Sequence, residues 1–231
     1  LVKSSADTMI TNGNNCYNLA GTEFTVYEDQ TLTKEVGKLT VSADGTSNVL
    51  EDLTAGIYYA KETKAGKGYF LDRKTYTVEV KPSETAELKV ANRPMDDPVT
   101  ILLQKQDATT GKPVGQGDAS LALAEFTVKY YGGDYAEGVD PATQGVSPTR
   151  TWVLRTDSLG EATFANADQS FIYNGQSYPY KVSGDDFYLS PLGEPTFPLG
   201  TVTIQETKAP EGYFINEEIH VRKIKQATQG T

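Results

Sequence analysis

Apolar and polar residues alternate in short runs along this chain, and Gly, Pro, Asn, Asp and Ser separate the runs. Alternation with a period of two is typical of strands with one buried face, and no window keeps a helical spacing for three turns. The predicted strands are EFTVYE, KLTVSA, GIYYAKE, TYTVEVK, AELKVAN, VTILLQK, EFTVKYY, TWVLRTD, YPYKVSG, TVTIQE and EIHVRKI. With 14 tyrosines and 8 phenylalanines to fill half-buried positions, the pattern predicts an all-β protein built from antiparallel sandwiches.

One phrase occurs twice in the chain, and a second shared phrase precedes each copy. AKETKAGKGYFL at 60–71 returns as IQETKAPEGYFI at 204–215, and TEFTVY at 22–27 returns as AEFTVK at 124–129. Each copy of the longer phrase begins at the end of a strand-like run. Repetition of this kind predicts a tandem of one module.

The second copy of the module is longer in its middle. Lys3 and Lys105 precede the two copies and are 102 positions apart, as are the phenylalanines of the shorter phrase. Glu62 and Glu206 of the longer phrase are 144 positions apart. The difference between these two offsets is 42 residues, so we expect an expansion spanning 132–200.

The length and composition fit two soluble domains, because 231 residues leave room for two cores of ordinary size. We expect module one at 1–95 and module two at 96–231, joined by the stretch ANRPMDDPV at 91–99. No apolar run approaches the ~20 residues that span a bilayer. A net charge of −10 argues against nucleic acid as a partner. With neither a signal peptide nor a sorting tail, the chain is expected to be cytosolic or an excised ectodomain.

Few residues offer the chemistry of a turnover enzyme. The lone Cys16 allows no internal disulfide, so an exported protein would need another crosslink, and we expect Cys16 and His220 to be structural. The chain has no G-x-S-x-G elbow, H-E-x-x-H helix, P-loop or paired cysteine motif. A carboxylate pair for glycoside hydrolysis stays open from sequence alone.

Module one resembles a known family. Its early lysine, LAGTEFTVY, YAKETKAGKGY and a closing VAN near a proline are similar to the B-type (Cna-B/SpaA-like) repeat of Gram-positive pilins and surface adhesins. The resemblance covers nearly all of module one and both ends of module two, and it implies two Ig-like, prealbumin-like sandwiches. It also implies a spontaneous isopeptide bond formed by Lys3, Glu62 and Asn92, with Lys105 and Glu206 at the matching positions of module two.

Isopeptide chemistry requires these residue types for physical reasons. A lysine amine attacks a carboxamide only when it is neutral, and burial in an apolar core lowers the pKa of an amine. A carboxyl group in the same dry pocket can pass the amine proton to the departing ammonia, which is the role expected of Glu62 and Glu206. Because the fold supplies proximity, no cofactor is required, and each module reacts once rather than turning over.

The third member of the set is unassigned in module two. The offset of 144 from Asn92 places a closing asparagine at position 236, beyond the end of the sequence. Asn166, Asn174 and Asn216 fall in turn-like or loop contexts, and none matches the family pattern. Three explanations stay open: the partner of Lys105 is missing from this chain, the bond forms differently, or a strand from elsewhere completes an open sheet edge.

The expansion is rich in Tyr, Phe, Pro and Gly, and beside these it contains the sole tryptophan, Trp152. Aromatic side chains on loops can form a ligand-binding surface, and we name Trp152 as the candidate ligand contact. The alternative is an extra hairpin or lid packed against the sandwich. No metal is predicted, because the acidic residues of the expansion lack EF-hand spacing: Asp134, Asp140, Asp185 and Asp186.

The sequence therefore predicts a self-crosslinked stalk, either pilin-like or part of an adhesin, at the cell-wall-anchored surface of a Gram-positive bacterium. One rival is an adhesive module that recognises a host protein or glycan through the expansion, and another is an accessory domain of a surface hydrolase. Expected partners are a host extracellular protein or glycan, other subunits, or the remainder of the same surface protein. We expect neither nucleic acid as a partner nor insertion into a membrane.

Overall fold

Strands make up nearly all the regular structure of this chain, so the prediction of an all-β protein is confirmed. The structure is a computed structural model that describes residues 1–97 and 102–225. The chain divides into two compact units, Leu1–Met95 and Asp96–Thr231, called unit 1 and unit 2 below. Among the described residues, no helix has the length and apolar character needed to cross a membrane.

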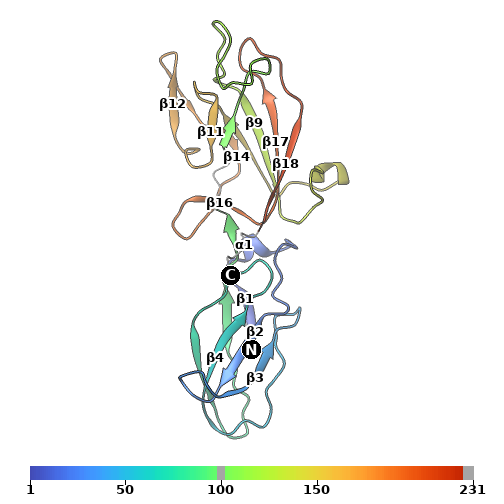
Figure 1. Cartoon of the computed structure of the whole chain (residues 1–231), viewed down its shortest axis with the longest axis vertical. Coiled ribbons are helices and arrows are strands. Elements are labelled where there is room, and N and C mark those ends of the chain that lie inside the picture. Colours follow the sequence, from blue (N-terminus) through green and yellow to red (C-terminus); the bar gives the residue numbers. More distant parts are fainter. Residues whose placement is uncertain (98–101, 226–231) are drawn as a thin grey trace. The chain divides into compact units, whose positions relative to one another are not determined.

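Unit 1 is a sandwich of two layers (Figure 1). A four-stranded antiparallel sheet in the order β3-β2-β4-β5 forms one layer, and β1 and β6 pair in parallel in the other. Its elements are β1 (Val2–Ser5), α1 (Thr8–Thr11), β2 (Glu23–Tyr27), β3 (Glu35–Thr40), β4 (Gly56–Lys64), β5 (Thr75–Val80) and β6 (Lys89–Asn92).

The core of unit 1 follows from the alternation along its strands. Phe24 and Val26 on β2, Tyr58 and Ala60 on β4, and Val90 on β6 are buried in one cluster. Each large apolar side chain removed from water contributes roughly 1.5–3 kcal/mol. The two short strands β1 and β6 are held on the larger sheet by this cluster.

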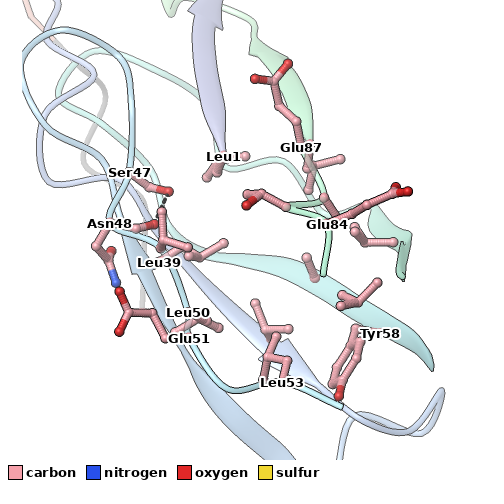
Figure 2. A pocket seen from close by; sticks show the side chains of 18 of the residues that line it. Leu1, Leu39, Ser47, Asn48, Leu50, Glu51, Leu53, Tyr58, Glu84 and Glu87 are labelled. Atoms are coloured by element: carbon pink, nitrogen blue, oxygen red, sulfur yellow. Dashed lines mark hydrogen bonds between the residues drawn. The ribbon is translucent and has the colours of Figure 1, made fainter. Parts of the chain in front are cut away.

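A pocket of about 720 Å³ opens at one side of this core, between the segments 46–53 and 81–88. Figure 2 shows leucine side chains such as Leu39, Leu50 and Leu53 around the space, with the carboxylates of Glu84 and Glu87 at its edge. None of the candidate reactive side chains of unit 1 lines this pocket.

Unit 2 is built around a five-stranded sheet in the order β14-β10-β9-β17-β18, with four smaller pairings beside it (Figure 1). β8 pairs with β11, β12 with β13, and β16 with both β15 and β7. Its elements are β7 (Asp96–Asp97), β8 (Leu102–Gln104), β9 (Glu125–Tyr131), η1 (Pro141–Gln144), β10 (Arg150–Arg155), β11 (Glu161–Thr163), β12 (Ser170–Tyr173), β13 (Gln176–Pro179), β14 (Lys181–Gly184), β15 (Tyr188–Leu189), β16 (Pro195–Pro198), β17 (Gly200–Lys208) and β18 (Ile219–Ile224).

The two units share a strand order and a register. β2 lies between β3 and β4 in unit 1 as β9 lies between β10 and β17 in unit 2, and β5 and β18 follow at the edge. Phe24 is opposite Glu62, and Phe126 is opposite Glu206. β6, the strand that ends unit 1, has no equivalent among the described residues of unit 2.

The division between Met95 and Asp96 falls inside the stretch 91–99, although this stretch is not without structure over its described part: 91–92 end β6, and Asp96–Asp97 form β7, which pairs with β16. One sequence prediction is wrong in this structure. Trp152 is not a surface residue: it is 1% exposed and packs against Phe164, Phe187 and Phe197. The expansion supplies these rings, so much of it contributes core rather than an exposed aromatic surface.

Candidate functional site

Lys3, Glu62 and Asn92 meet in the interior of unit 1. Nζ of Lys3 donates a hydrogen bond to Oδ1 of Asn92 at 2.5 Å and lies 3.1 Å from Oε1 of Glu62. Nδ2 of Asn92 donates to both carboxylate oxygens of Glu62, at 2.8 and 3.0 Å. The side chains of Lys3 and Glu62 have no exposed surface. The cluster is therefore a closed, water-excluded set of an amine, a carboxamide and a carboxylate.

Strand register brings the amine and the carboxamide together. β1 and β6 run parallel with Lys3 opposite Val90 and Ser5 opposite Asn92. Lys3, Val90 and Asn92 are all buried, because alternate residues on these strands face the interior. Glu62 reaches the same space from β4, where it lies opposite Phe24 of β2.

A glycine turn holds the backbone of Lys3. The amide of Lys3 donates to the carbonyl of Gly45 at 2.7 Å, and Gly45 has a left-handed φ of +85°. A Cβ atom at Gly45 would lie only 2.7 Å from the carbonyl oxygen of Lys3. Only glycine allows both the turn and this close approach.

Burial is the main electrostatic influence on the amine. Removal from water lowers the pKa of Lys3 below its ordinary value of 10.5, and the carboxylates of Glu62 and Asp72 offset only part of this effect. The ring of Phe24 lies 4.7 Å from Nζ. Asp72 accepts a hydrogen bond from the hydroxyl of Tyr76, whose pKa burial and Asp72 raise to about 12.

The contacts fit the transfer of the Asn92 side-chain acyl group from its own nitrogen, Nδ2, to the nitrogen of Lys3, Nζ. The amine touches the carbonyl end of the Asn92 carboxamide, and the leaving nitrogen Nδ2 already donates to Glu62. A carbonyl oxygen of Phe70 also accepts from Nδ2, and the amide of Asp72 donates to Oε2 of Glu62. These bonds hold the carboxamide and the carboxylate in fixed orientations, which is the condition for a large effective concentration of the reactants.

Unit 2 contains the lysine and the glutamate of the same set. Nζ of Lys105 donates to Oε2 of Glu206 at 2.8 Å and lies 2.7 Å from Oε1. The amide of Asn216 donates to Oε2 of Glu206, as the amide of Asp72 does to Glu62. The amide of Lys105 donates to the carbonyl of Gly160, another glycine with a positive φ. The backbone supports of unit 1 are thus repeated in unit 2.

In the part of the chain that the structure describes, Nζ of Lys105 pairs with Glu206 and forms no hydrogen bond with the carboxamide of an asparagine. Oδ1 of Asn166 accepts from Thr163, and Oδ1 of Asn216 accepts from the amide of Glu218. Asn174 lies in the turn between β12 and β13 with a φ of +49°. The asparagine expected at position 236 lies outside the sequence, so the partner of Lys105 stays unassigned.

Sequence reasoning missed the supporting residues of both clusters. Gly45 and Asp72 of unit 1 and Gly160 of unit 2 carry no motif of their own. The signal available for the glycines was their place after a short polar turn, SADG at 42–45 and DSLG at 157–160. Asp72 and Asn216 follow the repeated GYF phrase at the same distance, which the repeat itself contained.

Three of the four acidic residues named in the expansion have side-chain partners that fit structural roles. Asp140 caps η1 through the amide of Ala142, Asp185 accepts from the amide of Thr151, and Asp134 pairs with Lys223. Among the described residues, no group of three or more His, Cys, Asp or Glu side chains is placed to hold a metal ion.

The geometry described above defines unit 1 as a prealbumin-like β-sandwich with a buried Lys–Glu–Asn cluster. Residues 10–94 match the family model described as "SpaA: Prealbumin-like fold domain", which covers most of unit 1. No curated protein sequence matches the chain.

Solved structures similar to this chain include proteins of Gram-positive bacteria. The Bacillus anthracis TIE protein is 25% identical with a TM-score of 0.58, and the match covers 99% of this chain and 31% of that one. This chain therefore spans about a third of that protein's length. A C-terminal fragment of the pilus adhesin SpaC from Lactobacillus rhamnosus GG is 17% identical, with a TM-score of 0.43 and coverage of 98% and 83%. BcpA, the major pilin subunit of Bacillus cereus, is 16% identical, with a TM-score of 0.36 and coverage of 99% and 95%.

Proposed function

We propose that unit 1 forms an isopeptide bond between Lys3 and Asn92, with Glu62 as the proton shuttle. The observation that carries the proposal is the 2.5 Å contact between Nζ of Lys3 and Oδ1 of Asn92 inside a cluster without exposed side-chain surface. The neutral amine attacks Cγ of Asn92, the Nζ–Cγ bond forms and the Cγ–Nδ2 bond breaks. Glu62 carries one proton from Nζ to Nδ2, and ammonia leaves.

The bond would stabilise unit 1 and help it to resist tension. Lys3 and Asn92 are 89 positions apart, so the crosslink closes nearly the whole of unit 1 into a loop. In the chain-entropy model, a closure of this size stabilises the folded state by about 4.5 kcal/mol. It also carries tension from one end of the unit to the other without passing through the strands between, in a chain whose single cysteine leaves no internal disulfide.

From this chemistry we infer a structural role in an extracellular surface protein, as a segment of a pilus or of an adhesin stalk. The SpaA-type match to residues 10–94 supports this role. The partners are other subunits or further domains of the same protein, with the cell wall as its anchor. Recognition of a host protein or glycan through Trp152 loses its support, because that side chain lies in the core.

Intact-protein mass spectrometry tests the proposal. The wild-type chain is expected to be lighter than its sequence by the mass of one ammonia, and Glu62→Gln, which keeps the shape but removes the base, is expected to have the full mass. Glu23→Gln is the matched control, because Glu23 forms only an exposed pair with Lys64 and should leave the crosslink intact. A wild-type chain of full mass would overturn the proposal.

A further inference from the structure

The β12–β13 hairpin of unit 2 pairs with no other strand of the described chain. Its two strands form a sheet of their own, in which β12 runs antiparallel to β13. The hairpin lies at one side of unit 2 (Figure 1). Asn174 and Gly175 turn the chain with φ angles of +49° and +76°, which is typical of the tight two-residue turn between adjacent strands. The hairpin therefore has two outer edges, one along each strand.

The register of the hairpin shows which backbone groups of β12 face away from β13. The amide of Tyr180 donates to the carbonyl of Gln169 at 3.1 Å, so the backbone of Gln169 faces the β13 side. Successive residues of an antiparallel strand direct their backbone groups to opposite edges. The amide and the carbonyl of both Ser170 and Ile172 therefore lie on the outer edge of β12, where the described chain supplies no strand.

The two outer edges of the hairpin differ in how well they are protected against pairing. On β13, Pro179 lies opposite Ser170 and supplies no amide hydrogen to the outer edge of its strand. Proline and lysine are common ways to block an edge strand. β12 contains neither, and no residue of 169–180 is charged. Ile172 on β12 is 67% exposed. The outer edge of β12 is therefore uncharged, partly apolar and unprotected.

We infer that β12 is a contact between two copies of this chain, in which it pairs antiparallel with β12 of the second copy. Two copies of a chain with a net charge of −10 repel each other, so a contact between them is favoured where both surfaces are uncharged. A second copy also offers an edge with the same open backbone groups, and two-fold symmetry uses both edges at once. The inference does not depend on a crosslink in unit 1.

One register satisfies the open backbone groups of both edges. Ser170 of one copy then lies opposite Ile172 of the second copy, and each such pair exchanges its amide and carbonyl hydrogen bonds. The two-fold axis passes between the two copies of Phe171, which face each other in the closer, non-hydrogen-bonded type of pair. Phe171 already stacks on Tyr178 within the hairpin, with ring centroids 5.9 Å apart. The pairing therefore continues an existing row of aromatic rings from one copy to the other.

The contact is weak because the strands are short. β12 has 4 residues, and a pair of such strands buries far less than the roughly 1,200 Å² at the lower end of stable interfaces. Two copies therefore associate at high protein concentration, or where other attachments hold many copies close together and raise their effective concentration.

Disulfide trapping tests the register. The native cysteine is first removed with Cys16→Ala, and Phe171→Cys is added. The inferred register brings the two new thiols directly opposite each other, with Cα atoms about 4.5 Å apart, so a disulfide-linked dimer is expected under mild oxidation. Ile172→Cys is the matched control: its position is more exposed, but the two copies lie two residues out of register, beyond the ~7 Å limit for a disulfide. A mixture of Ser170→Cys and Ile172→Cys chains should form a mixed disulfide.

Sedimentation equilibrium tests whether the unmodified edge associates. The average mass of the wild-type chain is expected to rise with concentration, and Ile172→Lys, which places a charge on the open edge, should abolish the rise. Ser177→Lys places the same charge on the exposed face of β13 and should keep the rise. A wild-type chain that stays monomeric, or one whose association both lysine variants abolish equally, would overturn the inference. Equally fast crosslinking of Phe171→Cys and Ile172→Cys would also overturn it, because random collision favours the more exposed thiol.

Discussion

At the scale of single residues, burial of Lys3 and Glu62 as ions is costly, and the same burial favours the uncharged form of the amine. An amine and a carboxylate without exposed surface are expensive to bury as ions, even as a close pair. Burial lowers the pKa of Lys3, so the same environment that makes the charge costly favours the neutral, nucleophilic amine. In the proposed reaction, conversion of the amine to an amide would remove the charge permanently.

This balance predicts a pH dependence in a chain that cannot crosslink. In Asn92→Ala, the free energy of unfolding should rise as the pH increases from the lowered pKa of Lys3 toward the ordinary value of 10.5. In that window the unfolded chain binds a proton at Lys3 that the folded chain does not bind, so stability increases with pH. Urea unfolding across this range measures the slope. The double variant Lys3→Met, Asn92→Ala should show a flatter dependence, and equal slopes would contradict the account.

The candidate reactive residues could be predicted from the sequence, but the residues that position them could not. The resemblance to the B-type repeat, with its residues in the same order along the chain, made Lys3, Glu62 and Asn92 candidates, and the structure brings these three together. Gly45 acts through its backbone, which no side-chain motif reports. For Trp152 the sequence left two alternatives, a ligand contact and a packed hairpin or lid, because local sequence does not show whether an aromatic side chain in a long insertion is exposed; the structure packs it against other rings.

At the scale of elements, the turn that contains Gly45 positions β1. Gly45→Ala would place a Cβ atom 2.7 Å from the carbonyl oxygen of Lys3 at a φ of +85°. We expect a loss of about 1–2 kcal/mol from the left-handed backbone alone, and a larger share of uncrosslinked chain after expression. Thermal unfolding and intact mass measure the two effects.

Gly56→Ala is the matched control for this turn. Gly56 begins β4, its φ is not positive, and a Cβ atom there would meet nothing within 4 Å. The substitution should leave the crosslink complete and the stability equal or slightly higher. If Gly45→Ala behaved like Gly56→Ala, the turn would have no part in placing Lys3.

The aromatic cluster of unit 2 predicts a large effect of Trp152→Ala. Trp152 stacks on Phe187 and meets Phe164 and Phe197 edge to face. Its removal should lower the free energy of unfolding of unit 2 by about 3–5 kcal/mol. Urea unfolding followed by circular dichroism measures the loss. Phe214→Ala should change little, since Phe214 is 97% exposed, and similar values for both variants would contradict the burial of Trp152.

Strand positions were largely predictable, but pairings were not. Alternation marked runs such as EFTVYE at 23–28 and TVTIQE at 201–206, which fall on β2 and β17, because one face of each strand is buried. The four-residue helix α1 is too short to show a period, although Asp7 caps it through the amides of Met9 and Ile10. The pairing of Asp96–Asp97 with β16 joins residues about a hundred positions apart, which local patterns do not encode.

At the scale of the whole molecule, the proposed crosslink predicts a particular response to force. Tension applied at the two ends of the chain enters unit 1 near Lys3 and leaves it near Asn92. The proposed bond would keep the 89 positions between them from extending. In single-molecule pulling, Glu62→Gln should therefore lengthen by about 300 Å more than the wild-type chain. Equal extension of both chains would show that the wild type carries no such bridge.

Sequencing of proteolytic fragments tests the central claim most directly. After digestion of the folded wild-type chain, we predict a branched peptide that joins the segments around Lys3 and Asn92 and weighs their sum less one ammonia. The same digest of Glu62→Gln should contain the two segments as separate linear peptides. Recovery of only linear peptides from the wild-type chain, with an unmodified Lys3, would contradict the account.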